Sequence, residues 1–185
     1  KNIRFTITTN GTLLNDEKVE YLNKNMKNII LSIDGRKEVN DNMRLTAAGT
    51  GSYDIIINKI KKLVDGREEG QEYYLRGTYT HQNLDFSNDF LHLANEGFKE
   101  ISLEPVVVKD SEEISIRFED LEQIYDEYNK IYRYLKEKID SGEKINFYHY
   151  NINLKGGPCV YKRVSACGAG FEYIAITPSG DIYPC

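Results

Sequence analysis

The sequence predicts an α/β protein: about four strand–helix units that form a parallel sheet, followed by a short β-hairpin segment that contains cysteines. Three observations predict this fold. Runs of β-branched and aromatic residues alternate with amphipathic runs of helical spacing through residues 1–142. The texture changes to short β-like runs after Gly142, and all three cysteines follow that change. Strand–helix alternation is typical of βαβ units, whose strands pair in parallel.

Each expected strand is a short apolar run that ends in a polar turn. The first stops at Asn10-Gly11, a strong turn signal, and the last is broken at Pro105. The four strands are expected at residues 3–9, 28–35, 72–80 and 100–108. Crossovers between such strands are right-handed. Four units make half of an eight-stranded barrel or most of a small open sheet, and the pattern fits both.

The runs between the strands have the spacing of helices with one apolar face. The helices are expected at residues 13–26, 52–64, 86–98 and 118–142. Asn15 or Asp16 is expected to cap the first helix and Ser52 the second, while Gly97 and Gly142 end the third and fourth. The positions expected to face inward are Leu14, Val19, Leu22, Met26, Ile56, Ile60, Leu63, Ile124, Tyr128, Ile131, Leu135 and Ile139.

The expected domain organisation is a βα portion over residues 1–142 and a cysteine-bearing segment over residues 143–185. Residues 172–185 predict two short strands joined by a turn at residues 178–181, which would return Cys185 toward Cys167. Clustered cysteines in such a chain indicate metal binding or redox chemistry, because thiolates ligate zinc and iron–sulfur clusters. The alternative is that Cys159, Cys167 and Cys185 are small buried side chains.

Composition limits the partners. The net charge is -5, with acidic and basic residues interspersed, which disfavours a nucleic-acid partner. No apolar run approaches the ~20 residues of a membrane span, and no signal peptide is visible. We therefore expect a cytoplasmic protein without a membrane or nucleic-acid partner. Lys1 is not an initiator methionine, so the true N-terminus is expected to lie upstream.

Ligands of parallel α/β folds bind where the carboxyl ends of the strands meet. The segments TTNG, SIDG, TYTH and EPV stand at those ends and each carries a polar group. The alternative is that these are caps and turn residues, which fits Asn10, Asp34 and Asp85. The three histidines lack ligand spacing and are expected to be structural or exposed.

Two segments carry a family resemblance. TTNGTLL followed by LSIDG, with Arg44 twelve residues past Ser32, resembles the middle of the radical S-adenosylmethionine (AdoMet) fold. The spacing of Cys167, Gly180 and Cys185 resembles the opening of the SPASM extension, which holds auxiliary clusters. With GGPC, the chain most resembles the maturases that form thioether cross-links in six-cysteine peptides (SCIFF). The anaerobic sulfatase maturases are the next most similar group.

The resemblance implies a partial (β/α) barrel of the radical SAM type and an AdoMet site. Ser32 and Arg44 match positions that contact AdoMet, the guanidinium pairing with its methionyl carboxylate. Asn10 and Asp34 belong to the same motifs. The resemblance also implies an auxiliary [4Fe–4S] cluster on Cys167 and Cys185, with Cys159 as a further ligand whose spacing varies in the family. It identifies no catalytic residue.

The implied reaction begins with reductive cleavage of AdoMet to a radical that takes a hydrogen atom from a peptide residue, after which a cysteine sulfur bonds to that carbon. The implied partners are a cysteine-containing precursor peptide and a reductant such as flavodoxin or ferredoxin. Three parts of the family's pattern are absent from the sequence: the CxxxCxxC loop, the glycine-glycine-glutamate strand expected before Ile3, and the rest of the SPASM cysteines. We therefore expect an inactive fragment that either associates with itself through exposed sheet edges or is a compact piece left by proteolysis. The alternatives are oxidation of a protein cysteine or serine, as in sulfatase maturation, and a non-catalytic zinc- or peptide-binding βα module.

Overall fold

The computed structural model describes residues 4–151, 168–170 and 174–184. The chain divides into two compact units, Lys1–Asn151 and Ile152–Cys185. The first unit contains the parallel sheet with its helices, and the second contains a small hairpin.

Five parallel strands form the sheet of the first unit, in the spatial order β1-β2-β3-β4-β5. They are β1 (Thr6–Thr9), β2 (Asn28–Ser32), β3 (Glu72–Tyr79), β4 (Glu100–Pro105) and β5 (Asn146–Phe147). The spatial order equals the chain order, so every crossover joins neighbouring strands, as in an arc of a barrel. A doubly wound open sheet would reverse its order at a switch point. Of the two arrangements that fit the sequence, the structure has the barrel arc.

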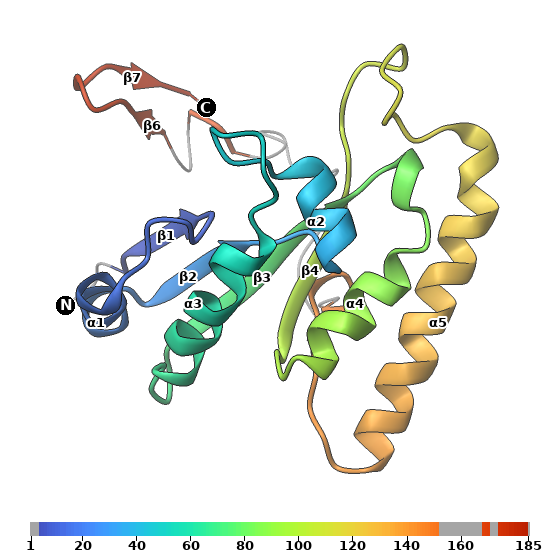
Figure 1. Cartoon of the computed structure of the whole chain (residues 1–185), viewed down its shortest axis with the longest axis horizontal. Coiled ribbons are helices and arrows are strands. Elements are labelled where there is room, and N and C mark those ends of the chain that lie inside the picture. Colours follow the sequence, from blue (N-terminus) through green and yellow to red (C-terminus); the bar gives the residue numbers. More distant parts are fainter. Residues whose placement is uncertain (1–3, 152–167, 171–173, 185) are drawn as a thin grey trace. The chain divides into compact units, whose positions relative to one another are not determined.

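Among the described residues, five α-helices and two 3-10 helices lie between the strands of the sheet, and a third 3-10 helix follows β5 (Figure 1). The α-helices are α1 (Asp16–Asn25), α2 (Lys37–Met43), α3 (Tyr53–Asp65), α4 (Phe86–Asn95) and α5 (Leu121–Asp140). The 3-10 helices are η1 (His81–Asn83), η2 (Phe118–Asp120) and η3 (Tyr148–Tyr150). Figure 1 shows α3, α4 and α5 running alongside the strands.

One face of the sheet forms the hydrophobic core with the helices. Alternate side chains of a strand point to opposite faces, and in β2 to β4 one set is buried: Ile29, Leu31, Leu75, Ile101 and Leu103. The helices cover this set with side chains that include Ile56, Ile60, Phe90, Leu93 and Ile131. The predicted inward positions of α1 and α3 are confirmed as buried, except that Met26 is partly exposed. Ile139 is 65% exposed, so its prediction was wrong: α5 runs past the sheet at that end.

The helix ends follow the predicted signals in part. Asn15 caps α1, its side chain accepting a hydrogen bond from the backbone N–H of Lys18. Ser52 stands at the cap position of α3, but its hydroxyl instead lies 3.2 Å from Nδ2 of Asn40 and caps nothing. Gly97 follows α4 with φ of +97°, the left-handed conformation that glycine adopts without a Cβ penalty.

Two elements differ from the sequence prediction. Helix α2 was not predicted, because residues 37–43 carry one apolar side chain before Met43 and show no helical period. Strand β5 has only two residues, and it extends the sheet beyond residue 142 by pairing in parallel with β4. The predicted fourth strand ends at Pro105, and Val107 beyond it is 93% exposed.

The second unit contains the predicted hairpin. Strands β6 (Ala175–Ile176) and β7 (Ile182–Tyr183) pair antiparallel. The backbone N–H of Thr177 donates to the carbonyl of Asp181 at 2.9 Å, and Gly180 adopts a φ of +93° in the turn. Cys159, Cys167 and Cys185 lie outside the described residues. Within the described part of the chain, no helix has the length and apolar character needed to span a bilayer.

Candidate functional site

Asp34 and Arg44 lie together at the carboxyl end of β2. Nε and Nη2 of Arg44 donate to the two carboxylate oxygens of Asp34 at 2.7 and 2.8 Å. The backbone N–H of Thr78 donates to the same carboxylate at 2.9 Å, and Asp34 is 3% exposed. A buried carboxylate needs such partners, because desolvation otherwise penalises its charge. The pair therefore ties the loop after β2 to the end of β3.

The turn after Asp34 is fixed by a helix on the core side of the sheet. Gly35 has a φ of +127°, and a Cβ there would lie 2.3 Å from the Cβ of Asp89. Both the backbone N–H and Nε of Arg36 donate to Oδ1 of Asp89, at 2.9 and 2.8 Å. Only glycine fits this close approach. Asp89 of α4 therefore holds the loop that positions Asp34.

The other two residues of the predicted AdoMet site lie apart from this pair. Ser32 ends β2 on the face of the sheet away from the core, opposite Arg76 in the β2–β3 register. Asn10 follows β1, and its Oδ1 accepts hydrogen bonds from the backbone N–H and the hydroxyl of Thr12. Asn10 thus makes the turn that its alternative interpretation predicts.

The metal-ligand prediction falls on residues outside the described part of the chain. Cys159, Cys167 and Cys185 have no described placement. Among the described residues, no group of three histidine, cysteine, aspartate or glutamate side chains is arranged to hold a metal ion. The cluster ligands therefore remain as the sequence predicts them.

The face of the sheet away from the core carries polar side chains, and we call it the polar face. It consists of Asn28, Ile30, Ser32, Tyr74, Arg76, Thr78, Ser102 and Glu104. Most of these residues and Tyr148 line a pocket of about 280 Å³. The ladder places Arg76 opposite Ser102, and Glu104 opposite Thr78, so both charges lie near the carboxyl ends of β3 and β4.

Three side chains form a hydrogen-bonded chain at the edge of this pocket. Oε2 of Glu104 lies 3.0 Å from Nε2 of His149, and Nδ1 of His149 lies 2.6 Å from the hydroxyl of Tyr128. The hydroxyl of Ser102 donates to Oε1 of Glu104 at 2.7 Å. Residues from β4 and η3 thus meet at one carboxylate, and Tyr128 of α5 is connected to it through His149.

These contacts determine the charge state of Glu104. Burial raises the pKa of its carboxyl, but the hydrogen bonds from Ser102 and His149 and the charges of His149 and Arg76 lower it further, so the pKa lies below its ordinary value. An ionised carboxylate only accepts hydrogen bonds, so we assign the hydrogen in this contact to Nε2 of His149. Burial, with the neighbouring Tyr79, raises the pKa of Tyr128, which keeps its hydroxyl protonated.

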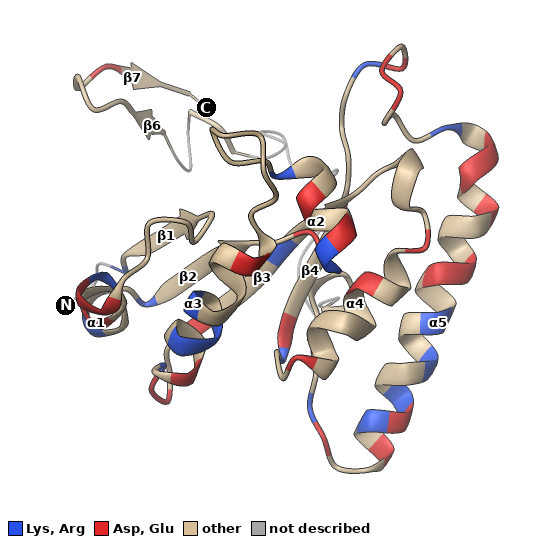
Figure 2. Ribbon diagram, in the orientation of Figure 1, with Lys and Arg blue, Asp and Glu red and all other residues tan. Residues whose placement is uncertain are grey.

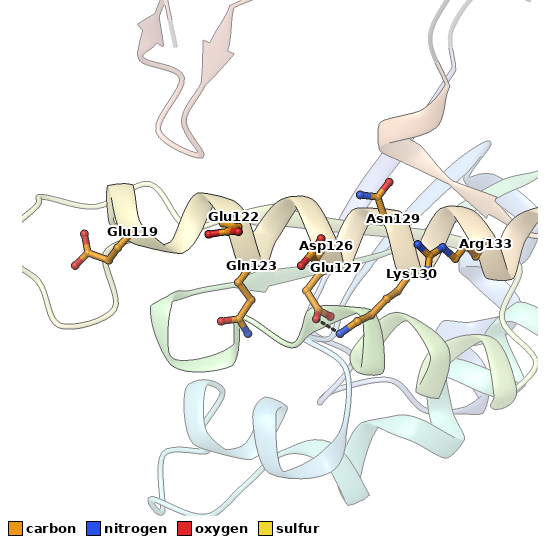
Figure 3. Close-up of a pocket in the computed structure, with 8 residues that line it drawn as sticks. All are labelled: Glu119, Glu122, Gln123, Asp126, Glu127, Asn129, Lys130 and Arg133. Atoms are coloured by element: carbon orange, nitrogen blue, oxygen red, sulfur yellow. Dashed lines mark hydrogen bonds and ion pairs between the residues drawn. The ribbon is translucent and has the colours of Figure 1, made fainter.

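A larger hollow lies along α5, but the residues that line it do not form a candidate catalytic or binding site. It measures about 610 Å³ and is lined by residues of η2 and α5 alone (Figure 3). Figure 2 shows acidic residues toward the start of α5, as the helix dipole favours, and a mixture of basic and acidic residues toward its end. The inward-facing Glu127 accepts from the backbone N–H of Ser87 at 3.1 Å and pairs with Lys130. We interpret the hollow as the solvated side of a helix.

Arg76 and the role of His149 were not predicted from the sequence. Alternation along β3 and β4 was a signal for Arg76, since it places Tyr74, Arg76 and Thr78 on one face. No signal of that kind existed for His149, because its position depends on the two-residue strand β5. Its partner Tyr128 was assigned to the apolar stripe of α5. All three histidines are hydrogen-bonded, as the structural expectation required: His81 to Asp120, His92 to Tyr53 and His149 to Glu104.

Comparison with known proteins identifies the class of fold first. No protein-family model matches the chain. A solved structure of native anSMEcpe with bound AdoMet has a TM-score of 0.75 over 99% of this chain and 50% of that one, at 15% identity. The AdoMet-bound Streptococcus suis SuiB has a TM-score of 0.65 over 99% and 43%, at 19% identity. At these identities the likeness shows the fold, and the predicted parallel partial barrel of the radical SAM type is confirmed.

The sequence relatives are maturases. A cysteine-type anaerobic sulfatase-maturating enzyme of Clostridium novyi is 27% identical over all of this chain and 50% of its own length. The mycofactocin maturase MftC of Mycolicibacterium smegmatis is 26% identical over 96% of this chain and 44% of its own length. The chain spans about half the length of the curated relatives it matches.

Proposed function

We propose that this chain is the AdoMet-binding middle of a radical SAM enzyme that modifies a peptide or protein. The observation that carries the proposal is the barrel arc, whose fold matches AdoMet-bound structures over nearly the whole chain. The relatives with maturase names support a macromolecular substrate. AdoMet, once bound and reduced, supplies a radical that removes a hydrogen atom, and the protein supplies binding, orientation and exclusion of water.

Ser32 and Arg44 are the proposed contacts of AdoMet. The hydroxyl of Ser32 lies on the polar face, where a ligand in the arc would reach it. Arg44 already uses Nε and Nη2 on Asp34, so it would meet the methionyl carboxylate through its remaining edge. Asp34 then acts as the support that holds Arg44, and Asn10 shapes the loop after β1.

Cys167 and Cys185, with Cys159, are the proposed ligands of an auxiliary [4Fe–4S] cluster. Thiolates suit that cluster, and the hairpin predicted between Cys167 and Cys185 is present. Anaerobic purification of the full-length protein tests this assignment. A brown protein with visible absorption and iron supports the cluster. A colourless protein with stoichiometric zinc supports the structural zinc module instead.

The proposed product is a thioether between a cysteine sulfur and a carbon of a ribosomal peptide. The second candidate is oxidation of a protein cysteine or serine, which the sulfatase-maturating relative favours at 27% identity. Incubation of the reduced full-length enzyme with each peptide separates them by mass. The cysteine-rich peptide encoded near the gene would lose two hydrogens and gain a cross-link. A peptide carrying a sulfatase active-site cysteine would instead be oxidised at that side chain. If neither peptide changes while AdoMet is cleaved, both substrate assignments are wrong.

A further inference from the structure

We propose that the pocket on the polar face is a deprotonation site, where Glu104 accepts the proton of a substrate thiol or hydroxyl and Arg76 stabilises the remaining anion. The inference rests on the proposed function, because it assigns the pocket to that enzyme's substrate. It adds two catalytic residues, Glu104 and Arg76, and one positioning residue, His149.

The pocket on the polar face brings a base and a cation together. Arg76 lies two residues before Thr78 on the same face, and Thr78 pairs with Glu104 across the ladder. Arg76 and Glu104 both line the pocket of about 280 Å³, together with Ser102 and Tyr148. A volume of this size is large enough for one side chain of a peptide.

Arg76 faces the pocket without a carboxylate partner among the described residues. Arg4, Arg36 and Arg44 pair with a carboxylate at 3.1 Å or less. The described arginines with no carboxylate oxygen within 4.0 Å are Arg67, Arg76, Arg117 and Arg133, and of these Arg76 lines the pocket. Its side chain is exposed and therefore accessible to a ligand. An arginine that faces a pocket without a fixed partner is suited to a developing thiolate or alkoxide.

Two neighbours hold the carboxylate of Glu104 in place. Ser102 contacts one carboxylate oxygen at 2.7 Å and His149 contacts the other at 3.0 Å. Tyr128 in turn contacts Nδ1 of His149 at 2.6 Å, which fixes the orientation of the ring. A general base must be ionised and fixed in place before its substrate arrives. His149 and Ser102 meet that requirement without filling the pocket.

One buried polar atom among the residues that line the pocket also lacks a hydrogen-bond partner. Oδ1 of Asn28 is buried and has no hydrogen-bond partner among the described residues. Asn28 lines the same pocket as Glu104. Buried acceptors in native proteins almost always have a partner, so an orphaned one in a pocket indicates a donor from a ligand or water. A peptide backbone N–H supplies such a donor.

The chemical step is a proton transfer and involves no change of oxidation state. The S–H or O–H bond of the substrate breaks heterolytically, its electron pair stays on sulfur or oxygen, and the proton passes to a carboxylate oxygen of Glu104. A free thiol has a pKa of about 8.5, so a carboxylate alone would deprotonate it rarely. The positive charge of Arg76 lowers the pKa of a thiol beside it and makes the transfer feasible. The titratable and charged side chains that face Glu104 are Arg76, His149 and, through His149, Tyr128.

A substrate-independent experiment tests the pocket first. The probe is 4-nitrothiophenol, whose thiolate absorbs visible light, titrated into the full-length protein before cluster loading. The wild-type protein is expected to lower the apparent pKa of the bound probe, and Arg76→Gln is expected to abolish that shift. Arg76→Lys keeps the charge and is expected to retain part of it. A probe that ionises with the wild-type protein as it does in buffer overturns the proposal.

The second experiment measures coupling in the loaded enzyme with the peptide that the wild-type enzyme modifies. Glu104→Gln is expected to lower product per 5′-deoxyadenosine by roughly 10²-fold, with 5′-deoxyadenosine formation retained. Raising the pH, which ionises the thiol unaided, is expected to restore part of the loss. The matched control is Glu100→Gln, because Glu100 lies on the same strand and face and bonds Asn146 instead.

Two results of this second experiment contradict the proposal. One is an unchanged ratio of product to 5′-deoxyadenosine in Glu104→Gln. The other is an equal loss of both products in Glu104→Gln and Glu100→Gln, which indicates a purely structural role. A wild-type enzyme that forms no 5′-deoxyadenosine refutes the proposed function itself. In that case the 4-nitrothiophenol titration still decides whether the pocket binds and ionises a thiol.

Discussion

Arg44 donates two hydrogen bonds to the carboxylate of Asp34, which lies ten positions earlier in the chain. Nε donates to Oδ2 at 2.7 Å, and Nη2 donates to Oδ1 at 2.8 Å. The Asp34 carboxylate also accepts the backbone N–H of Thr78 from the neighbouring strand. A residue predicted to bind a ligand carboxylate is therefore first committed to a carboxylate of the protein. This arrangement orients the guanidinium, so the proposed binding of AdoMet by Arg44 would depend on the order of the loop after β2.

Removal of the Asp34 carboxylate tests how much the ion pair with Arg44 contributes to stability. Asp34→Ala is expected to destabilise the full-length protein by about 2–3 kcal/mol, because it leaves the guanidinium of Arg44 and the N–H of Thr78 without their acceptor. Thermal unfolding measures the loss. Arg44→Lys keeps the charge but not the two-bond geometry and is expected to cost less. Equal stability of Asp34→Ala and the wild type would show that the pair contributes nothing.

Arg44→Ala tests the proposed contact of Arg44 with the methionyl carboxylate of AdoMet. The variant is expected to bind AdoMet at least about tenfold more weakly, the loss of one charge-assisted hydrogen bond. The affinity for 5′-methylthioadenosine, which lacks the methionyl carboxylate, is expected to change little. Calorimetric titration of both ligands separates the two cases. An equal loss for both ligands would mean that Arg44 acts through the fold and makes no contact with the carboxylate.

Gly77 of β3 lies where the neighbouring chain segments leave no room for a side chain. A Cβ at this position would lie 2.6 Å from the carbonyl oxygen of Ile33 and 2.7 Å from Cδ2 of Leu103. Gly77→Ala is therefore expected to destabilise the protein by about 2–3 kcal/mol, as overpacking of a core does. Gly49→Ala is the control: Gly49 has a φ of +74° but open space around it, so only a conformational cost of about 1 kcal/mol is expected. Equal melting temperatures of the two variants would contradict the steric explanation.

The two carboxylates of β4 predict opposite effects of pH on stability. The pKa of Glu104 is lowered, so its contribution is present above the ordinary glutamate pKa of about 4.3 and is lost as the pH falls through its folded value. The pKa of Glu100 is raised, chiefly by burial, so its contribution is present below about 4.3 and is lost as the pH rises through its folded value.

Unfolding midpoints measured from about pH 3 to about pH 7 detect these effects, because both carboxyl groups titrate within this range. Relative to the wild type, Glu104→Gln is expected to lose more stability at neutral than at acid pH. Glu100→Gln is expected to show the reverse. The same sign of change in both variants would show that the contacts of Glu104 with Ser102 and His149 do not stabilise its charge.

Much of the fold was readable from local patterns. The first four strands and the helices with an apolar face were predicted because β-branched runs and helical spacing report burial directly. Asn15 was identifiable as a cap because a capping side chain acts within three residues of itself. Helix α2 escaped because its stability comes from contacts such as that of Asn40 with Ser52, and not from an apolar stripe.

The site was less readable, because its contacts join residues far apart in the chain. Glu104 and His149 are 45 residues apart, and Arg36 and Asp89 are 53 apart. Side-chain alternation could place Arg76 and Glu104 on one face of their strands, but only the parallel register shows that they are diagonal neighbours across β3 and β4. Ser32 and Arg44 were found from a resemblance of motifs. That resemblance did not reveal that Asp34 holds Arg44.

Reductive cleavage of AdoMet is the activity on which the proposed function depends. The full-length protein, purified without oxygen and reconstituted with iron and sulfide, is mixed with AdoMet and dithionite, and 5′-deoxyadenosine is measured by chromatography. The wild type is expected to form 5′-deoxyadenosine, and Ser32→Ala is expected to form much less at subsaturating AdoMet. A reconstituted protein that contains its iron and yet neither binds nor cleaves AdoMet would refute the proposed function.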